Sequence, residues 1–132
     1  MEKIDKLSKI IVNYSLEINK DDKVLITYQN QACTDLVVGL IREVKNVGAT
    51  VNTKLVDPIV NHELLLSTTE DRAKLMGNYS EFEVKNYTSF IQIRYNINDY
   101  EDNDIPSNTR NLIGKYTRKF DEVRINGATV RS

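Results

Sequence analysis

The chain has 132 residues and a formal net charge of -1 at pH 7, with 18 Lys and Arg against 19 Asp and Glu. Hydrophobic residues make up 40% of it and charged residues 28%, which is typical of one globular domain and excludes a disordered chain. The charge balance gives no electrostatic basis for binding nucleic acid or an anionic membrane, so neither is expected as a partner.

The lack of a recognisable targeting signal and the single cysteine favour a cytoplasmic location. The charged residues 1–6 lead directly into an amphipathic pattern, unlike a secretory signal peptide, and no apolar run approaches the roughly 20 residues of a membrane-spanning helix. Cys33 is the single cysteine, which excludes an internal disulfide and fits a reducing compartment. Without a secretory signal, the three Asn-X-Ser/Thr triplets are interpreted as chance matches.

The first third of the chain predicts a helix followed by a buried strand. Apolar residues recur at three- and four-residue steps over residues 3–17 and define one stripe, which consists of Ile4, Leu7, Ile11, Tyr14 and Ile18. Turn-forming residues 19–22 interrupt this pattern. Residues 24–28 are almost continuously apolar or β-branched, which predicts the central strand of a parallel sheet, covered on both faces.

A strand–helix–strand unit follows from the next segment. A second helix should begin near residues 32–35 and end at Gly48, which suits a left-handed cap. Residues 50–56 alternate polar and apolar side chains, which predicts a half-exposed strand near an edge of the sheet. The short connections around the helix make the two strands parallel.

The middle of the chain predicts two helices and a third strand. A short helix is expected over residues 61–67, and Thr68 or Thr69 could cap another that runs to about residue 85. The apolar positions of this second helix are less regular, and Gly77 should weaken its middle. Residues 89–95 are expected to form the third strand.

The last part predicts one more helix and a tail without structure. A polar loop over residues 96–104 leads to a helix capped by Asp104 or Ser107, with Pro106 tolerated in its first turn. Residues 126–132 show no further element and resemble the end of a chain that was cut. The predicted fold for residues 1–132 is a single α/β domain with three layers. Its Rossmann-like, partial doubly wound sheet has about three parallel strands in the order 2-1-3, flanked by helices.

Ligands of such sheets bind at the carboxyl ends of the strands, here the loops at residues 29–33, 57–61 and 96–104. The first loop contains no glycine, so its backbone cannot approach a pyrophosphate closely. The chain also lacks both the G-x-G-x-x-G fingerprint and a P-loop. Dinucleotide binding is therefore not expected.

Two side chains, His62 and Cys33, have the chemistry of candidate site residues. His62 could form a metal site with Asp57 and Glu63, but one imidazole at a helix start is more typical of a surface or capping residue. Cys33 lies at an apolar-facing position of the second helix, which favours a buried, inert thiol over a nucleophile.

The acidic segment, residues 99–104, does not follow the EF-hand pattern. It lacks glycine at the sixth position and has Arg110 where the closing glutamate belongs, which favours a solvated loop. The seven tyrosines are spread through every element, unlike a platform for stacking bases. We therefore predict no catalytic, cofactor-binding or metal-binding residue in this chain.

The order of four segments resembles the M29 family of metallo-aminopeptidases, the AmpS/PepS-like enzymes. These segments are residues 11–16 (Ile-Val-Asn-Tyr-Ser-Leu), residues 18–26, the helix end Val47-Gly48-Ala49 and the strand Phe90-Ile91-Gln92-Ile93-Arg94. The likeness covers residues 3–125 and is strongest in the first 60. Asp21 stands where the family usually has glycine, which alters the turn but not the fold.

The resemblance implies the truncated amino-terminal, non-catalytic domain of a longer aminopeptidase. In that family, two divalent metals such as zinc or cobalt are held by Glu, His, Asp and Tyr side chains of a later domain, and no position here matches them. The implied partners are the catalytic domain of the same polypeptide and a second copy in a homodimer. The full enzyme alone would take peptide substrates, and this domain would help to enclose its active site.

Two alternatives remain open. The chain could be a stand-alone α/β module that binds a small ligand or a partner protein through the strand-end loops near Tyr28, Asp57 and Asn98. It could also be a small enzyme that uses Cys33 or His62, the least favoured of the three hypotheses.

Overall fold

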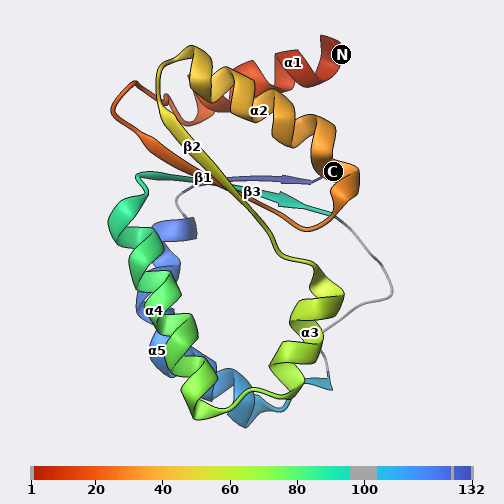
Figure 1. Ribbon diagram of the computed structural model, residues 1–132, viewed down its shortest axis with the longest axis vertical. Coiled ribbons are helices and arrows are strands. Elements are labelled where there is room, and N and C mark those ends of the chain that lie inside the picture. Colours follow the sequence, from red (N-terminus) through yellow and green to blue (C-terminus); the bar gives the residue numbers. More distant parts are fainter. Residues whose placement is uncertain (1, 96–103, 126, 132) are drawn as a thin grey trace.

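The computed structural model describes residues 2–95, 104–125 and 127–131. Within these residues the sheet has four parallel strands in the order β2-β1-β3-β4 (Figure 1). The strands are β1 (Lys23–Tyr28), β2 (Thr50–Leu55), β3 (Ser89–Arg94) and β4 (Ala128–Arg131). The predicted parallel sheet and the order 2-1-3 of its first three strands are confirmed, with β2 at an edge.

The fourth strand corrects the prediction that the tail adds no element. β4 lies beside β3, with Val130 opposite Ile93. Gly127 makes this approach possible, because a side chain at that position would collide with the carbonyl oxygen of Phe90. A strand of only four residues carries little local pattern, and its pairing with β3 is what stabilises it.

One face of the sheet packs against the amino-terminal helices (Figure 1). These are α1 (Glu2–Lys9), which continues as the π-helix η1 (Ile10–Ser15), and α2 (Thr34–Asn46), which follows the short 3₁₀ turn η2 (Gln31–Cys33). Fully buried side chains fill the space between them and the strands. They include Val12, Val24, Ile26, Leu40, Val44, Ile91 and Ile93.

The apolar stripe of the first helix differs from the predicted one. Ile11 and Ile18 are buried as expected, but Leu7 is exposed and Tyr14 is 77% exposed, while Val12 is buried instead. The physical reason is the wide helical turn of η1, in which the Leu16 N–H bonds to the Ile11 carbonyl. Each such turn holds more residues than an α-turn, so the inward-facing positions shift.

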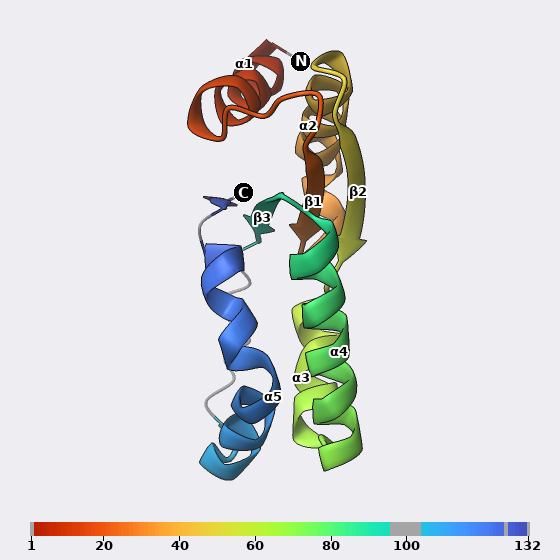
Figure 2. The same cartoon turned by 90° about the vertical axis from the view of Figure 1, so that its left-hand side faces the viewer.

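Three helices lie on the other side of the sheet and extend away from it (Figure 2). They are α3 (Pro58–Leu66), α4 (Glu70–Asn86) and α5 (Ser107–Ile125). α4 and α5 run side by side, and both end near the sheet. With α1 and α2 on the first face, this arrangement confirms the predicted three-layer α/β class.

The starts of these helices follow local capping chemistry. α3 begins at Pro58 rather than at residue 61, because the Asp57 carboxylate accepts hydrogen bonds from the N–H groups of Ile59 and Val60. Thr69 caps α4 as predicted, accepting from the Arg72 N–H at 3.2 Å. In the described part of the chain, no helix has both the length and the apolar character needed to cross a bilayer.

The last helix also differs from its prediction. Ser107 is its first residue, and the Pro106 carbonyl accepts from the backbone N–H groups of Thr109 and Arg110. The Asp104 carboxylate, expected as a possible cap, lies instead against the His62 ring. Asp104 thus joins α3 to the segment before α5.

Candidate functional site

The two faces of the sheet differ in chemistry. In β1, Val24 and Ile26 face α1 and α2, whereas Leu25 and Thr27 face the side of α3, α4 and α5. The same alternation in β3 places Gln92 on the second face. The first face is a continuous apolar core, and the second mixes apolar and polar side chains.

A polar row crosses the sheet on this second face. The strand register aligns Lys54, Thr27, Gln92 and Thr129, one residue from each of β2, β1, β3 and β4. A sheet face covered by helices is ordinarily apolar, because buried polar groups must find hydrogen-bond partners. A polar row there indicates a surface for binding rather than a second core.

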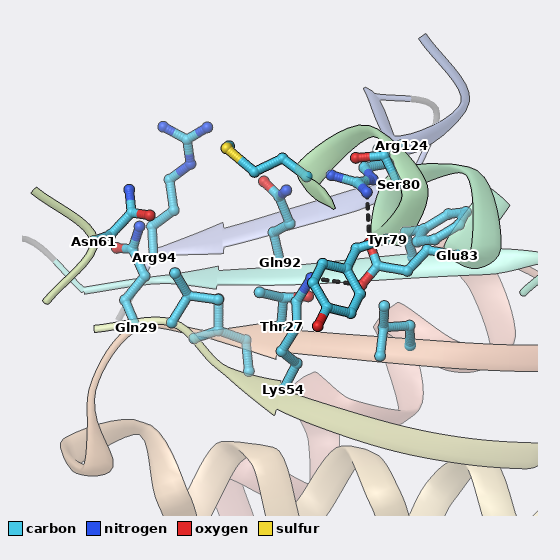
Figure 3. A pocket seen from close by; sticks show the side chains of 15 residues that line it. Thr27, Gln29, Lys54, Asn61, Tyr79, Ser80, Glu83, Gln92, Arg94 and Arg124 are labelled. Carbon is cyan, nitrogen blue, oxygen red and sulfur yellow. Dashed lines mark hydrogen bonds and ion pairs between the residues drawn. The ribbon is translucent and has the colours of Figure 1, made fainter. Parts of the chain in front are cut away.

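A pocket of about 460 Å³ lies over this row, between the sheet and the helices α3, α4 and α5 (Figure 3). This volume falls in the range of small-molecule sites. Its polar lining consists of Thr27, Gln29, Lys54, Asn61, Tyr79, Ser80, Glu83, Gln92, Arg94 and Arg124. Gln29 and Asn61 come from two of the predicted strand-end loops, so one end of the pocket lies where ligands of α/β sheets bind.

One end of the pocket is closed by a buried carboxylate and two cations. The Glu83 side chain on α4 lies 2.6 Å from Lys54 Nζ on β2 and 2.5 Å from the Arg124 guanidinium on α5. Glu83 is only 8% exposed, so its charge depends on these two partners. The three side chains tie both long helices to the edge of the sheet.

The opposite end carries one guanidinium and several amides (Figure 3). Arg94 stands at the end of β3, near Gln29 and Asn61. The Gln29 side-chain carbonyl oxygen accepts from the Tyr95 N–H at 2.9 Å, and its amide nitrogen donates to no group among the described residues. Within the described residues, the Arg94 and Gln92 side chains form no hydrogen bond or ion pair.

The electrostatic balance of the lining is positive. Lys54, Arg94 and Arg124 are its cations, and Glu83 is its carboxylate. Glu83 is bonded to both Lys54 and Arg124, so among the cations of the lining Arg94 is the one without a carboxylate partner within the described residues. The site can therefore hold an anion through hydrogen-bond donors.

The residues singled out from the sequence do not assemble into one site. Cys33 is 1% exposed and belongs to the core on the other face of the sheet, which confirms a buried thiol. The interpretation of His62 as a surface or capping residue is wrong. His62 is only 7% exposed, and its Nε2 lies 3.2 Å from an Asp104 carboxylate oxygen. The earlier start of α3 places His62 inside the helix rather than at its first turn. Asp57 is occupied as a helix cap.

The described part of the chain contains no cluster of side chains suited to binding a metal ion. Residues 2–95, 104–125 and 127–131 contain no group of three or more His, Cys, Asp or Glu side chains that could hold an ion. Asn98 and residues 99–103 of the acidic segment lie outside the described residues. That the chain has no metal or catalytic residue stays a prediction.

Sequence reasoning missed the charged residues of the pocket, Lys54, Glu83, Arg94 and Arg124. A usable signal existed in the strands, since Thr27 and Gln92 interrupt runs that are otherwise apolar. Polar residues at alternating positions of a central strand point to one hydrophilic face. The helical contributions to the pocket carry no comparable pattern.

Fold and pocket together define an α/β domain with a Rossmann-like parallel sheet and a polar pocket over one sheet face that extends to the carboxyl ends of the strands. No family model matches the chain, and no curated protein matches it. Among solved structures, it is similar to wild-type AmpT from Thermus thermophilus, with a TM-score of 0.62 and 15% sequence identity. The match covers 98% of this chain and 36% of the AmpT chain. At this identity the likeness shows a shared fold.

Proposed function

We propose that this chain is the amino-terminal, non-catalytic domain of a two-metal aminopeptidase of the M29 family. The observation that carries the proposal is the fold likeness to AmpT, which spans 98% of this chain but 36% of that one. It agrees with the resemblance to the AmpS/PepS-like enzymes that residues 3–125 carry independently. A domain of a longer enzyme accounts for both.

Exposed apolar side chains support the idea that a further domain packs here. The helices α3, α4 and α5 present eight of them: Ile59, Val60, Leu64, Leu66, Leu75, Tyr79, Phe82 and Val123. Exposed apolar side chains that gather into one patch mark contact surfaces in other proteins. We assign it to the catalytic domain of the same polypeptide, whose active site this domain would help to enclose.

The remaining parts of the proposal follow from the family resemblance. The parent enzyme would remove amino-terminal residues from peptides, act as a homodimer and work in the cytoplasm. Two divalent metals, such as zinc or cobalt, would be held by its later domain. The described residues of this chain do not fit these metals, because they contain no suitable donor cluster.

Metal retention by the purified 132-residue chain tests the proposal. After dialysis against Zn²⁺ or Co²⁺ and then metal-free buffer, we expect no stoichiometric metal by elemental analysis and no hydrolysis of an aminoacyl p-nitroanilide. His62→Ala is the matched variant. Retention of one or more metal ions per chain that is lost in His62→Ala would contradict a non-catalytic domain.

A stand-alone ligand-binding module is the second candidate function. The polar pocket of about 460 Å³ favours it, since such a pocket can serve a small molecule without any catalytic group. A stop codon directly after the Ser132 codon would favour this module over an enzyme domain.

A further inference from the structure

The polar pocket has a charge pattern that the proposed function leaves without a role. We propose that it binds a small organic carboxylate, with the Arg94 guanidinium holding the carboxylate group. This inference concerns a ligand of this domain itself, and so goes beyond its proposed part in an aminopeptidase.

The charge of the ligand follows from which charged side chains of the pocket already have a partner. Glu83 is bonded to both Lys54 and Arg124, so it cannot hold a cationic ligand without losing a partner. At the other end, the Arg94 and Gln92 side chains have no partner among the described residues. A guanidinium surrounded by amide donors prefers an acceptor-rich anion.

The polar floor of the pocket adds further donors. Thr27 and Gln92 lie opposite each other in neighbouring strands, and both are half-buried. Ser80 on α4 is 5% exposed and, within the described residues, its hydroxyl forms no hydrogen bond. Buried and half-buried polar groups that lack a hydrogen-bond partner in the protein bond to a ligand or to water.

A carboxylate fits this geometry better than a phosphate. Phosphate sites usually combine several backbone N–H groups of a glycine-rich loop or a helix start. Here the loop at residues 29–33 contains no glycine, and the Asp57 carboxylate already caps the start of α3. A single planar guanidinium matches one carboxylate through two parallel hydrogen bonds.

The rest of the ligand should be apolar. Leu25 and Phe90 are buried side chains of the same sheet face, and Met76 of α4 lines the pocket opposite them. This wall can cover an aliphatic body, while the volume of about 460 Å³ limits the ligand to a small molecule or the end of a peptide. A free small acid and the carboxyl terminus of a peptide both present the same carboxylate group.

Titration of the ¹⁵N-labelled chain tests this proposal, with N-acetyl-L-leucine as the probe. We expect saturable shifts of the backbone amide signals of Thr27, Gln92 and Arg94. N-acetyl-L-leucinamide, which lacks the negative charge, should bind more weakly by a factor of about ten or more. A short acetylated peptide that ends in leucine distinguishes the sources: preference for it indicates a peptide terminus, and preference for the smaller probe indicates a free acid.

Three variants show whether Arg94 holds the carboxylate. Arg94→Gln should weaken binding of N-acetyl-L-leucine about ten-fold or more, and Arg94→Lys should lie between it and the wild type. Arg42→Gln removes an exposed charge on α2 and should change nothing. Arg94 is exposed, so its variants should keep the unfolding temperature of the wild type. Equal binding of the acid and the amide, or equal effects of Arg94→Gln and Arg42→Gln, would overturn the proposal.

Discussion

Glu83 joins three elements through one buried carboxylate. Its two oxygens bind Lys54 of β2 and Arg124 of α5, and no neighbour along its own helix supplies either contact. Both cations keep partial access to solvent, whereas the carboxylate has little. The main cost of removing it is the loss of two charge-assisted hydrogen bonds in a poorly solvated place.

Glu83→Gln should therefore lower the free energy of unfolding by about 2 kcal/mol, measured by urea denaturation. Glu81→Gln is the control on the same helix. Its carboxylate pairs with Lys85 one turn away, and an exposed pair of this type contributes little to stability, so the loss should be much smaller than for Glu83→Gln. Equal losses in the two variants would show that the contacts of Glu83 with the sheet and with α5 are not stabilising.

Glu70 and Tyr116 form a hydrogen bond between α4 and α5, with the Tyr116 hydroxyl donating at 2.7 Å. This bond, and the nearby charges of Lys115 and Lys74, hold the pKa of Glu70 below its usual value. The same bond raises the pKa of Tyr116. The contribution of Glu70 to folding stability is present above the ordinary carboxylate pKa and is lost as pH falls through the lowered pKa. The contribution of Tyr116 to folding stability is present below the ordinary phenol pKa and is lost as pH rises through the raised pKa.

Glu70→Gln should bring the pKa of Tyr116 down towards that of a free tyrosine. The reason is that a neutral amide accepts a weaker hydrogen bond from the phenol and no longer repels the phenolate. An alkaline titration followed by NMR of labelled tyrosine rings measures this change. Glu81→Gln, whose carboxylate bonds to a lysine, should leave Tyr116 unaffected. An unchanged Tyr116 titration in Glu70→Gln would contradict the hydrogen bond.

Gly77 lies at the contact between α4 and α5. The sequence predicts that it weakens α4, but the structure gives it a packing role. A Cβ atom at this position would lie 2.8 Å from the Tyr116 carbonyl oxygen, on the backbone of α5. The two helices can approach this closely only without a side chain there.

Gly77→Ala should lower the free energy of unfolding by about 1–3 kcal/mol, although alanine is the better helix former. Thermal unfolding followed by circular dichroism measures the effect. Asn78→Ala, at the adjacent exposed position, should be neutral or stabilise by a few tenths of a kcal/mol, since it changes helix propensity alone. A stabilising Gly77→Ala would mean that the helices are further apart than described.

Strands and helices with strong local patterns were predictable from the sequence. β1 and β3 are short apolar runs, and α2 is an amphipathic helix followed by Gly48, whose φ of 84° matches its expected left-handed cap. The wide turn of η1 and the four-residue β4 depend on tertiary contacts, so local periodicity misplaced Tyr14 and missed Val130. The earlier start of α3 could have been predicted from Asp57 and Pro58.

The pocket was less predictable than the fold. Its place at the carboxyl ends of the strands follows from topology, and Gln29 and Asn61 belong to loops expected there. Lys54, Glu83 and Arg124 meet only because α4 and α5 end near the sheet. Such contacts between distant segments leave no trace in one sequence.

As a whole molecule, the chain combines a well-packed half with a more open one. The face of the sheet under α1 and α2 is an apolar core, and the other face carries the pocket and the helices with exposed apolar residues. A catalytic domain packed on α3, α4 and α5 would cover that apolar surface.

Sequencing the transcript past the Ser132 codon would test whether this chain is one domain of an aminopeptidase. We expect an open reading frame that continues into a second domain carrying Glu, His, Asp and Tyr side chains as ligands for two metals. A stop codon directly after Ser132, or a continuation without such ligands, would contradict the proposed function.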